Sequence, residues 1–299
     1  MGNPQCLADA TTGRMTAFAT KLREQGRSTA TVARHLRHLQ VIFRWAKRQG
    51  YLQTVPTVEI PKQQKGMRGR PITLEEFERM IVSVPKAVGE LAADSFRFYL
   101  QGLWTSGLRL EESLALRWDE APGAIVVELG GRRPMLRIPA EAEKGGTHRL
   151  LPITPEFAEL LATIPEDERS GRVFKLLTKA GQLAKPSRHS IGPRVGAIGR
   201  AAGVVTDQRE KKGEIVKEFA SAHDLRRAFG FRWSRRVMPT ILRELMRHAD
   251  ITTTMRYYVG VNAEATADEL WAAVEGKTGT TLGTIEAAEE KQDSKTSSF

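Results

Sequence analysis

A segment rich in proline, glycine and basic residues, TVPTVEIPKQQKGMRGRP over residues 54–71, limits how this chain can fold. It contains three prolines, two glycines and four basic residues with little periodicity, which is the composition of a linker. Directly after it, Thr73 and Glu76 form a capping-box pattern before the apolar run FERMI, so a new domain begins there. We therefore predict a small domain over residues 1–53 and a larger one over residues 72–275, joined by this basic linker.

The small domain is predicted to contain a long helix over residues 28–49, preceded by a shorter helix near residues 11–25. Ser28 or Thr29 can cap the start of the long helix, and Gly50 can end it. At about 100° per residue, one face of this helix is apolar, with Val32, Leu36, Leu39, Phe43 and Ala46. The nearly opposite face carries Arg34, Arg37, Arg44 and Arg48. Because no acidic residue interrupts these arginines, we expect them to contact DNA phosphates rather than form a merely solvated face.

The distribution of charge indicates a polyanionic partner. The formal net charge is +11, and residues 1–70 hold 13 Lys and Arg against 3 Asp and Glu, whereas residues 71–275 hold 30 against 28. A positive field concentrated at one end favours nucleic acid over a generally basic, soluble surface.

Cysteine content and hydropathy exclude several other classes of protein. Cys6 is the only cysteine, which excludes an intramolecular disulfide and a cysteine-rich zinc site. No apolar run approaches the roughly 18 residues that a membrane span needs, and the N-terminus lacks the pattern of a signal peptide. The sequence therefore predicts a soluble, cytoplasmic protein, associated with the nucleoid if its partner is DNA.

The larger domain combines mostly helical patterns with one block of strands. Helical stretches are predicted over residues 93–118 with a break at Ser106-Gly107, from Thr154-Pro155, over 189–202, and from Ser221 onward, with restarts at Pro239 and Asp250 and a last helix over 262–274. Strand-like runs cover residues 124–129, 135–139 and 149–153. The charged insert at 204–218 is either a loop or a hairpin, and the tail at 276–299 is predicted to be disordered. The predicted fold class is α+β, mostly α, with a small antiparallel three-stranded sheet.

Four short segments carry the functional signal, and each is weak alone. They are TSGLRLEE (105–112), EKGGTHRLLP (143–152), SAHDLRRAF (221–229) and LMRHADITTTMRYY (245–258). In this order and spacing they resemble the tyrosine recombinase (phage integrase) family, and the likeness runs from about residue 11 to residue 275.

The resemblance implies a role for each matched residue. The six catalytic positions are Arg109, Lys144, His223, Arg226, His248 and Tyr257. Glu112 matches the acidic residue that supports the first arginine. Tyr257 stands nine residues after His248, as the nucleophile does in the family, whereas Tyr258 is expected to be a packing or DNA-backbone neighbour.

The family's chemistry explains why these residue types are needed. Two arginines, Arg109 and Arg226, hold the nonbridging oxygens of a phosphodiester, and His248 adds a hydrogen bond. Tyr257 attacks to form a 3′-phosphotyrosine, with His223 as the candidate base and Lys144 as the candidate acid for the leaving oxygen. Because arginines supply the charge, no metal or other cofactor is expected.

The resemblance also implies an architecture and a partner. It predicts a helical, SAM-like core-DNA-binding domain and a mixed catalytic domain that enclose double-stranded DNA, with four protomers acting on two recombination sites. The helix at 262–274 could dock on a neighbouring protomer or on its own domain. The alternatives are an enzyme like a type IB topoisomerase, which acts as a monomer, and a catalytically silent DNA-binding protein on the same fold.

Three features depart from the family's usual pattern. Arg247 stands where a glycine usually precedes the second histidine, which we expect to change a turn and leave the chemistry intact. The insert at 204–218 is longer than usual. The small domain is short and has room for one helix fewer than the family's core-binding domain.

Overall fold

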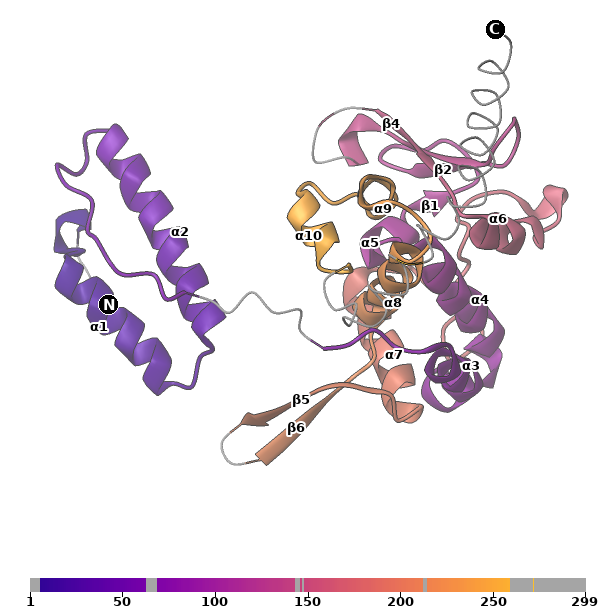
Figure 1. Ribbon diagram of the computed structural model, residues 1–299, viewed down its shortest axis with the longest axis horizontal. Helices are drawn as coiled ribbons and strands as arrows, with labels where there is room; N and C mark the ends of the chain where they lie inside the picture. Colours follow the sequence, from indigo (N-terminus) through magenta and orange to yellow (C-terminus); the bar gives the residue numbers. More distant parts are fainter. Residues whose placement is uncertain are drawn as a thin grey trace, which may run out of the picture. The chain divides into compact units, whose positions relative to one another are not determined.

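The computed structural model describes residues 6–62, 69–142, 146, 148–211, 214–258 and 271. It divides into two compact units, Met1–Met67 and Arg68–Phe299, so the division falls inside the predicted linker (Figure 1). Within the described residues, no helix combines the length and the apolar character needed to cross a membrane. Lys144 and the tail at 276–299 lie outside the described residues, as does the predicted helix at 262–274 apart from Trp271.

The first unit is built on two helices, α1 (Thr12–Glu24) and α2 (Thr29–Arg48), after a short 3₁₀ turn, η1 (Leu7–Asp9). Of the two candidate caps for α2, Ser28 is the one used, because its hydroxyl accepts the backbone N–H of Thr31. The predicted apolar face packs inward, with Val32, Leu36, Phe43 and Ala46 buried and Leu39 packed against the same core. The four arginines of the opposite face are exposed, as the helical period predicts.

Part of the predicted linker belongs to the packing of this first unit. Val55, Val58 and Ile60 are partly buried against the core that α1 and α2 form. Thr57 also donates its backbone N–H to the hydroxyl of Thr12, 3.2 Å away. The segment therefore contributes apolar side chains that its proline and glycine content did not indicate.

The second unit contains the other helices. They are α3 (Leu74–Val88), α4 (Glu90–Ser106), α5 (Leu110–Leu114), α6 (Pro155–Ala162), α7 (Arg188–Ala201), α8 (Ala222–Ser234), α9 (Pro239–Met246) and α10 (Ile251–Met255), with 3₁₀ turns η2 (Ala140–Ala142) and η3 (Glu166–Glu168). Local sequence explains several starts. Thr73 and Glu76 form the predicted capping box, Thr154 and Asp250 cap α6 and α10 through their side chains, and Pro239 is the first residue of α9.

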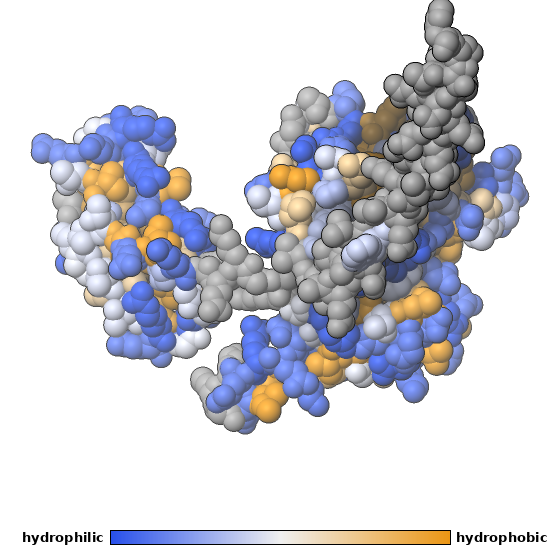
Figure 2. All heavy atoms as spheres, in the orientation of Figure 1, coloured by the Kyte–Doolittle hydropathy of each residue, from blue (hydrophilic) through white to orange (hydrophobic). Residues whose placement is uncertain are grey.

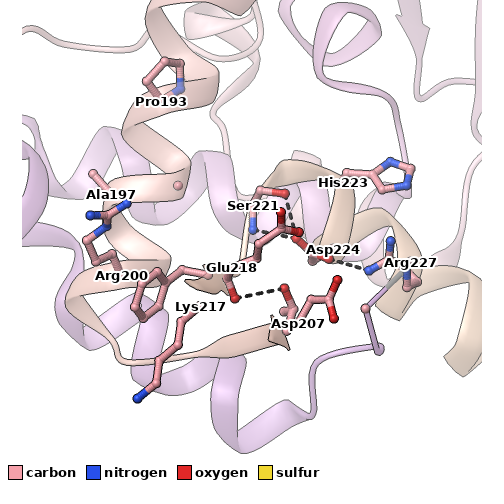
Figure 3. A pocket seen from close by; sticks show the side chains of 14 residues that line it. Pro193, Ala197, Arg200, Asp207, Lys217, Glu218, Ser221, His223, Asp224 and Arg227 are labelled. Atoms are coloured by element: carbon pink, nitrogen blue, oxygen red, sulfur yellow. Dashed lines mark hydrogen bonds and ion pairs between the residues drawn. The ribbon is translucent and has the colours of Figure 1, made fainter. Parts of the chain in front are cut away.

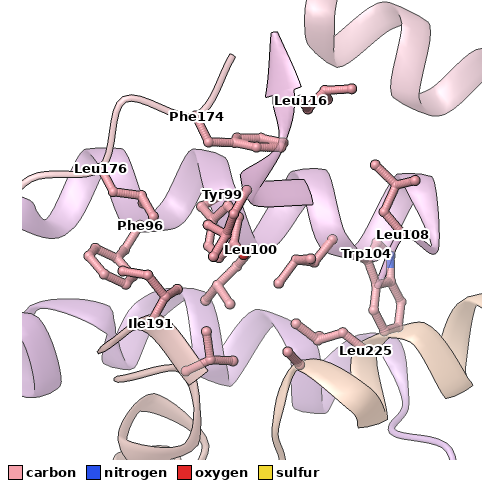
Figure 4. Close-up of a cluster of buried hydrophobic side chains, with 14 of the residues drawn as sticks. Phe96, Tyr99, Leu100, Trp104, Leu108, Leu116, Phe174, Leu176, Ile191 and Leu225 are labelled. Carbon is pink, nitrogen blue, oxygen red and sulfur yellow. The ribbon is translucent and has the colours of Figure 1, made fainter. Parts of the chain in front are cut away.

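Helix α4 is the centre of the core of the second unit. Its side chains Phe96, Tyr99 and Leu100 are fully buried, and Figure 4 shows them facing side chains of other segments, among them Phe174 and Ile191. The one polar atom of Tyr99 is satisfied, since its hydroxyl lies 2.8 Å from that of Ser113. This packing ties α5, and with it the start of the functional site, to the middle of the unit.

The sheet has one strand more than predicted. Its order is β1 (Leu116–Arg117), β2 (Ile125–Glu128), β3 (Met135–Ile138) and β4 (Arg149–Pro152). The three expected strands pair antiparallel, but β1 pairs parallel to β2, so the predicted three-stranded antiparallel sheet is wrong in this respect. A strand of two residues shows no alternation in the sequence, and β1 follows directly from a helical pattern. The α+β, mostly helical fold class is confirmed.

The charged insert forms a two-stranded hairpin, β5 (Val205–Lys211) and β6 (Glu214–Phe219). Figure 1 shows it extending away from the helices of its unit. Figure 2 shows mostly hydrophilic residues on it, and its apolar Ile215 is 70% exposed. The base of the hairpin is anchored near the start of the unit, because Arg70 donates to the carbonyl of Val205 and forms an ion pair with Glu76.

Candidate active site

Four of the predicted catalytic side chains line one cleft of about 680 Å³ in the second unit. Arg109 lies at the N-cap of α5, His223 and Arg226 lie in the first turns of α8, and His248 follows α9. These residues are up to 139 positions apart (248 − 109), so the tertiary fold alone brings them together. Arg188 and Thr253 also line this cleft, and no sequence pattern had singled them out.

Glu112 holds Arg109 in place. The Arg109 guanidinium donates to one carboxylate oxygen of Glu112 at 2.7 Å, and the Arg109 backbone N–H donates to the other at 2.9 Å. A further guanidinium N–H of Arg109 donates to the carbonyl of Arg247 at 3.0 Å. The predicted supporting role of Glu112 thus has a geometric basis: the carboxylate fixes both the main chain and the side chain of Arg109.

Arg247 places its side chain inside the site, which the sequence did not indicate. Its backbone is left-handed, with φ 50° and ψ 50°, a conformation that glycine takes most easily. Its side chain is 6% exposed, and its guanidinium lies 3.5 Å from the Glu112 carboxylate. We expected arginine at this position to change a turn and to leave the chemistry intact. Instead, the left-handed turn is present and an additional cation reaches Glu112.

The charge of Glu112 is maintained by these two arginines. Burial alone would raise the pKa of its carboxyl, but the charge of Arg247 and the hydrogen bonds from Arg109 outweigh burial and leave the pKa below its ordinary value. Glu112 is therefore a carboxylate at neutral pH, and it accepts hydrogen bonds rather than supplying a proton.

Arg226 is the most buried cation of the cleft. It is 5% exposed, and its two terminal nitrogens donate to the carbonyls of Gly107 and Met246. Burial, followed by the charge of Arg109, lowers its pKa to about 10, so Arg226 is still charged at neutral pH. The carbonyls fix the plane of the guanidinium, and its remaining N–H groups can donate to an anion.

The two histidines of the cleft are uncharged at neutral pH in the free protein. Burial, followed by the charges of Arg226 and Arg109, lowers the pKa of His248 to about 4. Desolvation, followed by the charge of Arg227, lowers the pKa of His223. A neutral imidazole can accept a proton, which is what a general base requires.

The two adjacent tyrosines differ in what their hydroxyl groups do. The Tyr258 hydroxyl donates to the carbonyl of Val237 at 2.7 Å, whereas among the described residues the Tyr257 hydroxyl has no hydrogen-bond partner. Tyr257 is not one of the residues that line the cleft, but its ring lies parallel to that of His248 with centroids 6.1 Å apart. Of the two hydroxyls, that of Tyr257 is the one available for chemistry.

The Tyr257 ring rests against α8 because residue 230 is glycine. A Cβ atom at Gly230 would lie 2.6 Å from Cε1 of Tyr257 and 2.7 Å from the sulfur of Met246, which is closer than atoms pack. Burial raises the pKa of Tyr257 despite the opposing charges of Arg226 and Arg227. The phenol is therefore protonated at neutral pH, and it needs a base to become a nucleophile.

A second pocket, of about 870 Å³, adjoins the first at His223 and Ser221. Figure 3 shows its lining, with Asp224 and Arg227 joined by an ion pair of 2.5 Å. Both of these side chains are buried, and Asp224 also accepts from the hydroxyl and backbone N–H of Ser221. This network fixes the first turn of α8, from which His223 and Arg226 project.

The arginines predicted to contact DNA lie in the first unit, outside this cleft. Arg34, Arg37, Arg44 and Arg48 are exposed on α2. None of them forms an ion pair with an acidic group in the described part of the chain, so their charge is not neutralised there.

Comparisons with known proteins agree with the motifs. No family model matches the sequence. Tyrosine recombinase XerD of Pseudomonas putida strain KT2440 is 26% identical over 239 residues, covering 78% of this chain and 72% of the relative. A solved structure of a lambda integrase(75-356) dimer bound to a COC′ core site matches with a TM-score of 0.61 at 16% identity, covering 88% of this chain and 84% of that one. Most of the chain is therefore similar to tyrosine recombinases. The predicted resemblance is confirmed.

A transposon integrase shares the fold of this chain as well. The Tn1549 transposon integrase in complex with a circular intermediate DNA matches with a TM-score of 0.57 at 15% identity, covering 88% of this chain and 85% of that one. The fold is therefore one that chains of very different sequence adopt.

Proposed function

We propose that this protein is a tyrosine recombinase, which cleaves and rejoins double-stranded DNA at a specific site through a 3′-phosphotyrosine intermediate on Tyr257. One observation carries the proposal: two arginines and two neutral histidines line a single cleft, and the ring of Tyr257 lies against one of those histidines. Such a set suits a phosphodiester, because it combines fixed cations with groups that exchange protons.

The arginines would hold the scissile phosphate. Arg109 and Arg226 are each fixed by hydrogen bonds within the protein, and each retains N–H groups for the nonbridging oxygens. Negative charge increases on these oxygens in the transition state. Donors that are already oriented therefore stabilise the transition state more than they stabilise the bound DNA substrate.

The covalent step exchanges one phosphate ester for another. The Tyr257 oxygen forms a bond to phosphorus as the bond from phosphorus to the 5′ oxygen breaks, and the phenolic proton passes to His223. Lys144 gives a proton to the departing 5′ oxygen. Rejoining reverses these transfers, so no external energy source is needed. The role of Lys144 is inferred from its sequence pattern, since this residue lies outside the described ones.

The first unit would supply most of the affinity for DNA. Its four exposed arginines on α2 offer charge to the phosphate backbone, and such binding weakens with increasing salt. We infer that four protomers act on two DNA sites, as recombination between two duplexes requires, and that the enzyme works at the nucleoid in the cytoplasm. The likeness to a transposon integrase supports a mobile element as its setting.

A nicked duplex that carries the DNA flanking the gene tests the proposal, because cleavage near the nick releases a short strand and traps the covalent adduct. Wild type and Tyr258→Phe should form the adduct, and Tyr257→Phe should form none. If Tyr257→Phe forms as much adduct as wild type, the assignment of Tyr257 as the nucleophile is wrong. DNA binding without any adduct would favour a silent DNA-binding protein. Efficient relaxation by a monomer of plasmids that lack the site would favour the topoisomerase alternative.

The role of Lys144 can be tested separately. Lys144→Ala should cleave ordinary DNA slowly but should regain most of its rate on DNA with sulfur in place of the 5′ bridging oxygen, because a thiolate leaves without a proton. Failure of this rescue would remove Lys144 from the role of acid and leave the Tyr257 assignment untouched.

A further inference from the structure

Three consecutive threonines, Thr252, Thr253 and Thr254, precede the two tyrosines, and only one of them is buried. Thr254 has no exposed surface, whereas Thr252 is exposed and Thr253 is half-buried at the cleft. A fully buried hydroxyl needs a hydrogen-bond partner. The motif comparison that assigned His248 and Tyr257 gave this residue no role.

The partner of the Thr254 hydroxyl is His248. The distance from Thr254 Oγ1 to His248 Nδ1 is 2.9 Å, across six residues of sequence. The same residue also contacts the nucleophile through its main chain, because its carbonyl accepts the backbone N–H of Tyr257 at 2.9 Å. Thr254 therefore contacts both His248 and Tyr257 without lining the cleft itself.

The hydrogen bond at Nδ1 decides what the other ring nitrogen can do. A neutral imidazole carries one proton, on either Nδ1 or Nε2. If the threonine hydroxyl donates to Nδ1, the proton lies on Nε2, and His248 presents an N–H donor. If Nδ1 carries the proton, Nε2 is an acceptor and would repel a phosphate oxygen.

We propose that Thr254 is a positioning residue that donates to Nδ1 of His248, so that His248 presents its Nε2–H as a hydrogen-bond donor to the scissile phosphate. This inference rests on the proposed function and adds a residue to its site. The low pKa of His248 is consistent with it, since a doubly protonated ring would leave the hydroxyl nothing to donate to.

The tautomer can be measured in the DNA-free protein without any substitution. Nitrogen-15 NMR of the histidine side chains distinguishes a protonated Nε2 from a protonated Nδ1, and the His248 signals are assigned by their loss in His248→Gln. We expect the Nε2–H form near pH 7. An Nδ1–H form, or a doubly protonated ring, would overturn the proposal whether or not the enzyme is a recombinase.

The substitution test uses Thr254→Val, which keeps the shape of the side chain and removes the hydroxyl. Removal of a hydrogen bond of this kind corresponds to a decrease of about tenfold, and we expect that decrease in the single-turnover rate of adduct formation. Affinity for DNA should be unchanged, and the NMR signals of His248 should change to a mixture of tautomers. Thr254→Ser should restore both the rate and the tautomer.

Thr252→Val is the matched control, because Thr252 lies two residues away and is exposed. It should cleave DNA at the wild-type rate. The proposal fails if Thr254→Val cleaves as fast as wild type, or if Thr254→Ser is as slow as Thr254→Val. If Tyr257 is not the nucleophile, the result would be different: Tyr257→Phe would form the full amount of adduct, and the His248 tautomer would be unchanged.

Discussion

The arginines of the first unit and those of the cleft show how burial changes the use of one side chain. Arg34, Arg37, Arg44 and Arg48 are exposed on α2, where water and salt screen their charge. In the cleft, Arg226 is 5% exposed and held by two carbonyls, and Arg109 is held by Glu112. The first set suits attraction to a phosphate backbone at many positions. The second set suits one phosphate in one orientation.

The largest effect is expected at Arg226, where a substitution can keep the positive charge and remove the oriented guanidinium donors. Arg226→Lys keeps the charge but cannot reproduce two carbonyl contacts and a planar fork. The single-turnover cleavage rate should fall about 100-fold or more, the size of effect seen when an oriented transition-state donor is removed. The dissociation constant for DNA should change little, as measured by fluorescence anisotropy. A rate near that of wild type would mean that charge alone suffices in the cleft.

The exposed arginines should show the opposite pattern. Replacing Arg37 and Arg44 together by alanine should weaken DNA binding and reduce the slope of log affinity against log salt by about 0.9 for each phosphate that is no longer neutralised. At saturating DNA, the cleavage rate should stay within about threefold of wild type, since these side chains lie outside the cleft. An unchanged salt slope would remove α2 from the DNA interface.

Arg247 extends the comparison to a further buried arginine, which lies beside Glu112. Arg247→Gly and Arg247→Ala both remove the cation beside Glu112, and cleavage should slow about tenfold in each, as expected for one charge-assisted contact. Their stabilities should differ, because glycine suits the left-handed backbone and alanine does not, by about 1 kcal/mol in urea denaturation. Equal rates in wild type and both variants would leave Arg247 with a structural role only.

The smallest expected effect is a difference in pH dependence. Among the groups proposed to act on the phosphate, His223 titrates, and its pKa lies below the ordinary value of about 6.5. The cleavage rate at saturating DNA should therefore be constant near neutral pH. It should fall only at a pH below the pKa of His223, where the imidazole takes up a proton. DNA affinity should not fall over the same range. A cleavage rate that rises on acidification would exclude His223 as the base.

Much of the fold follows from short-range patterns. The caps at Ser28, Thr73 and Thr154 mark helix starts, and each acts within three residues, so a local reading of the sequence is sufficient. Both faces of α2 follow from the helical period in the same way. Strand β1 was not predicted, because it is recognised only by its pairing with β2 and because two residues are too few to show an alternating pattern.

The sequence by itself determined the two-part organisation, most of the helices, and the ordered series of motifs that resembles tyrosine recombinases. Only the tertiary structure decided that the charged insert is a hairpin, that Arg247 reaches Glu112, and that Thr254, unlike Thr252, is buried against His248. The physical reason is separation along the chain and burial. A cap or an amphipathic face depends on neighbours a few residues away, whereas the contacts of a buried side chain depend on distant segments that only the folded chain brings together.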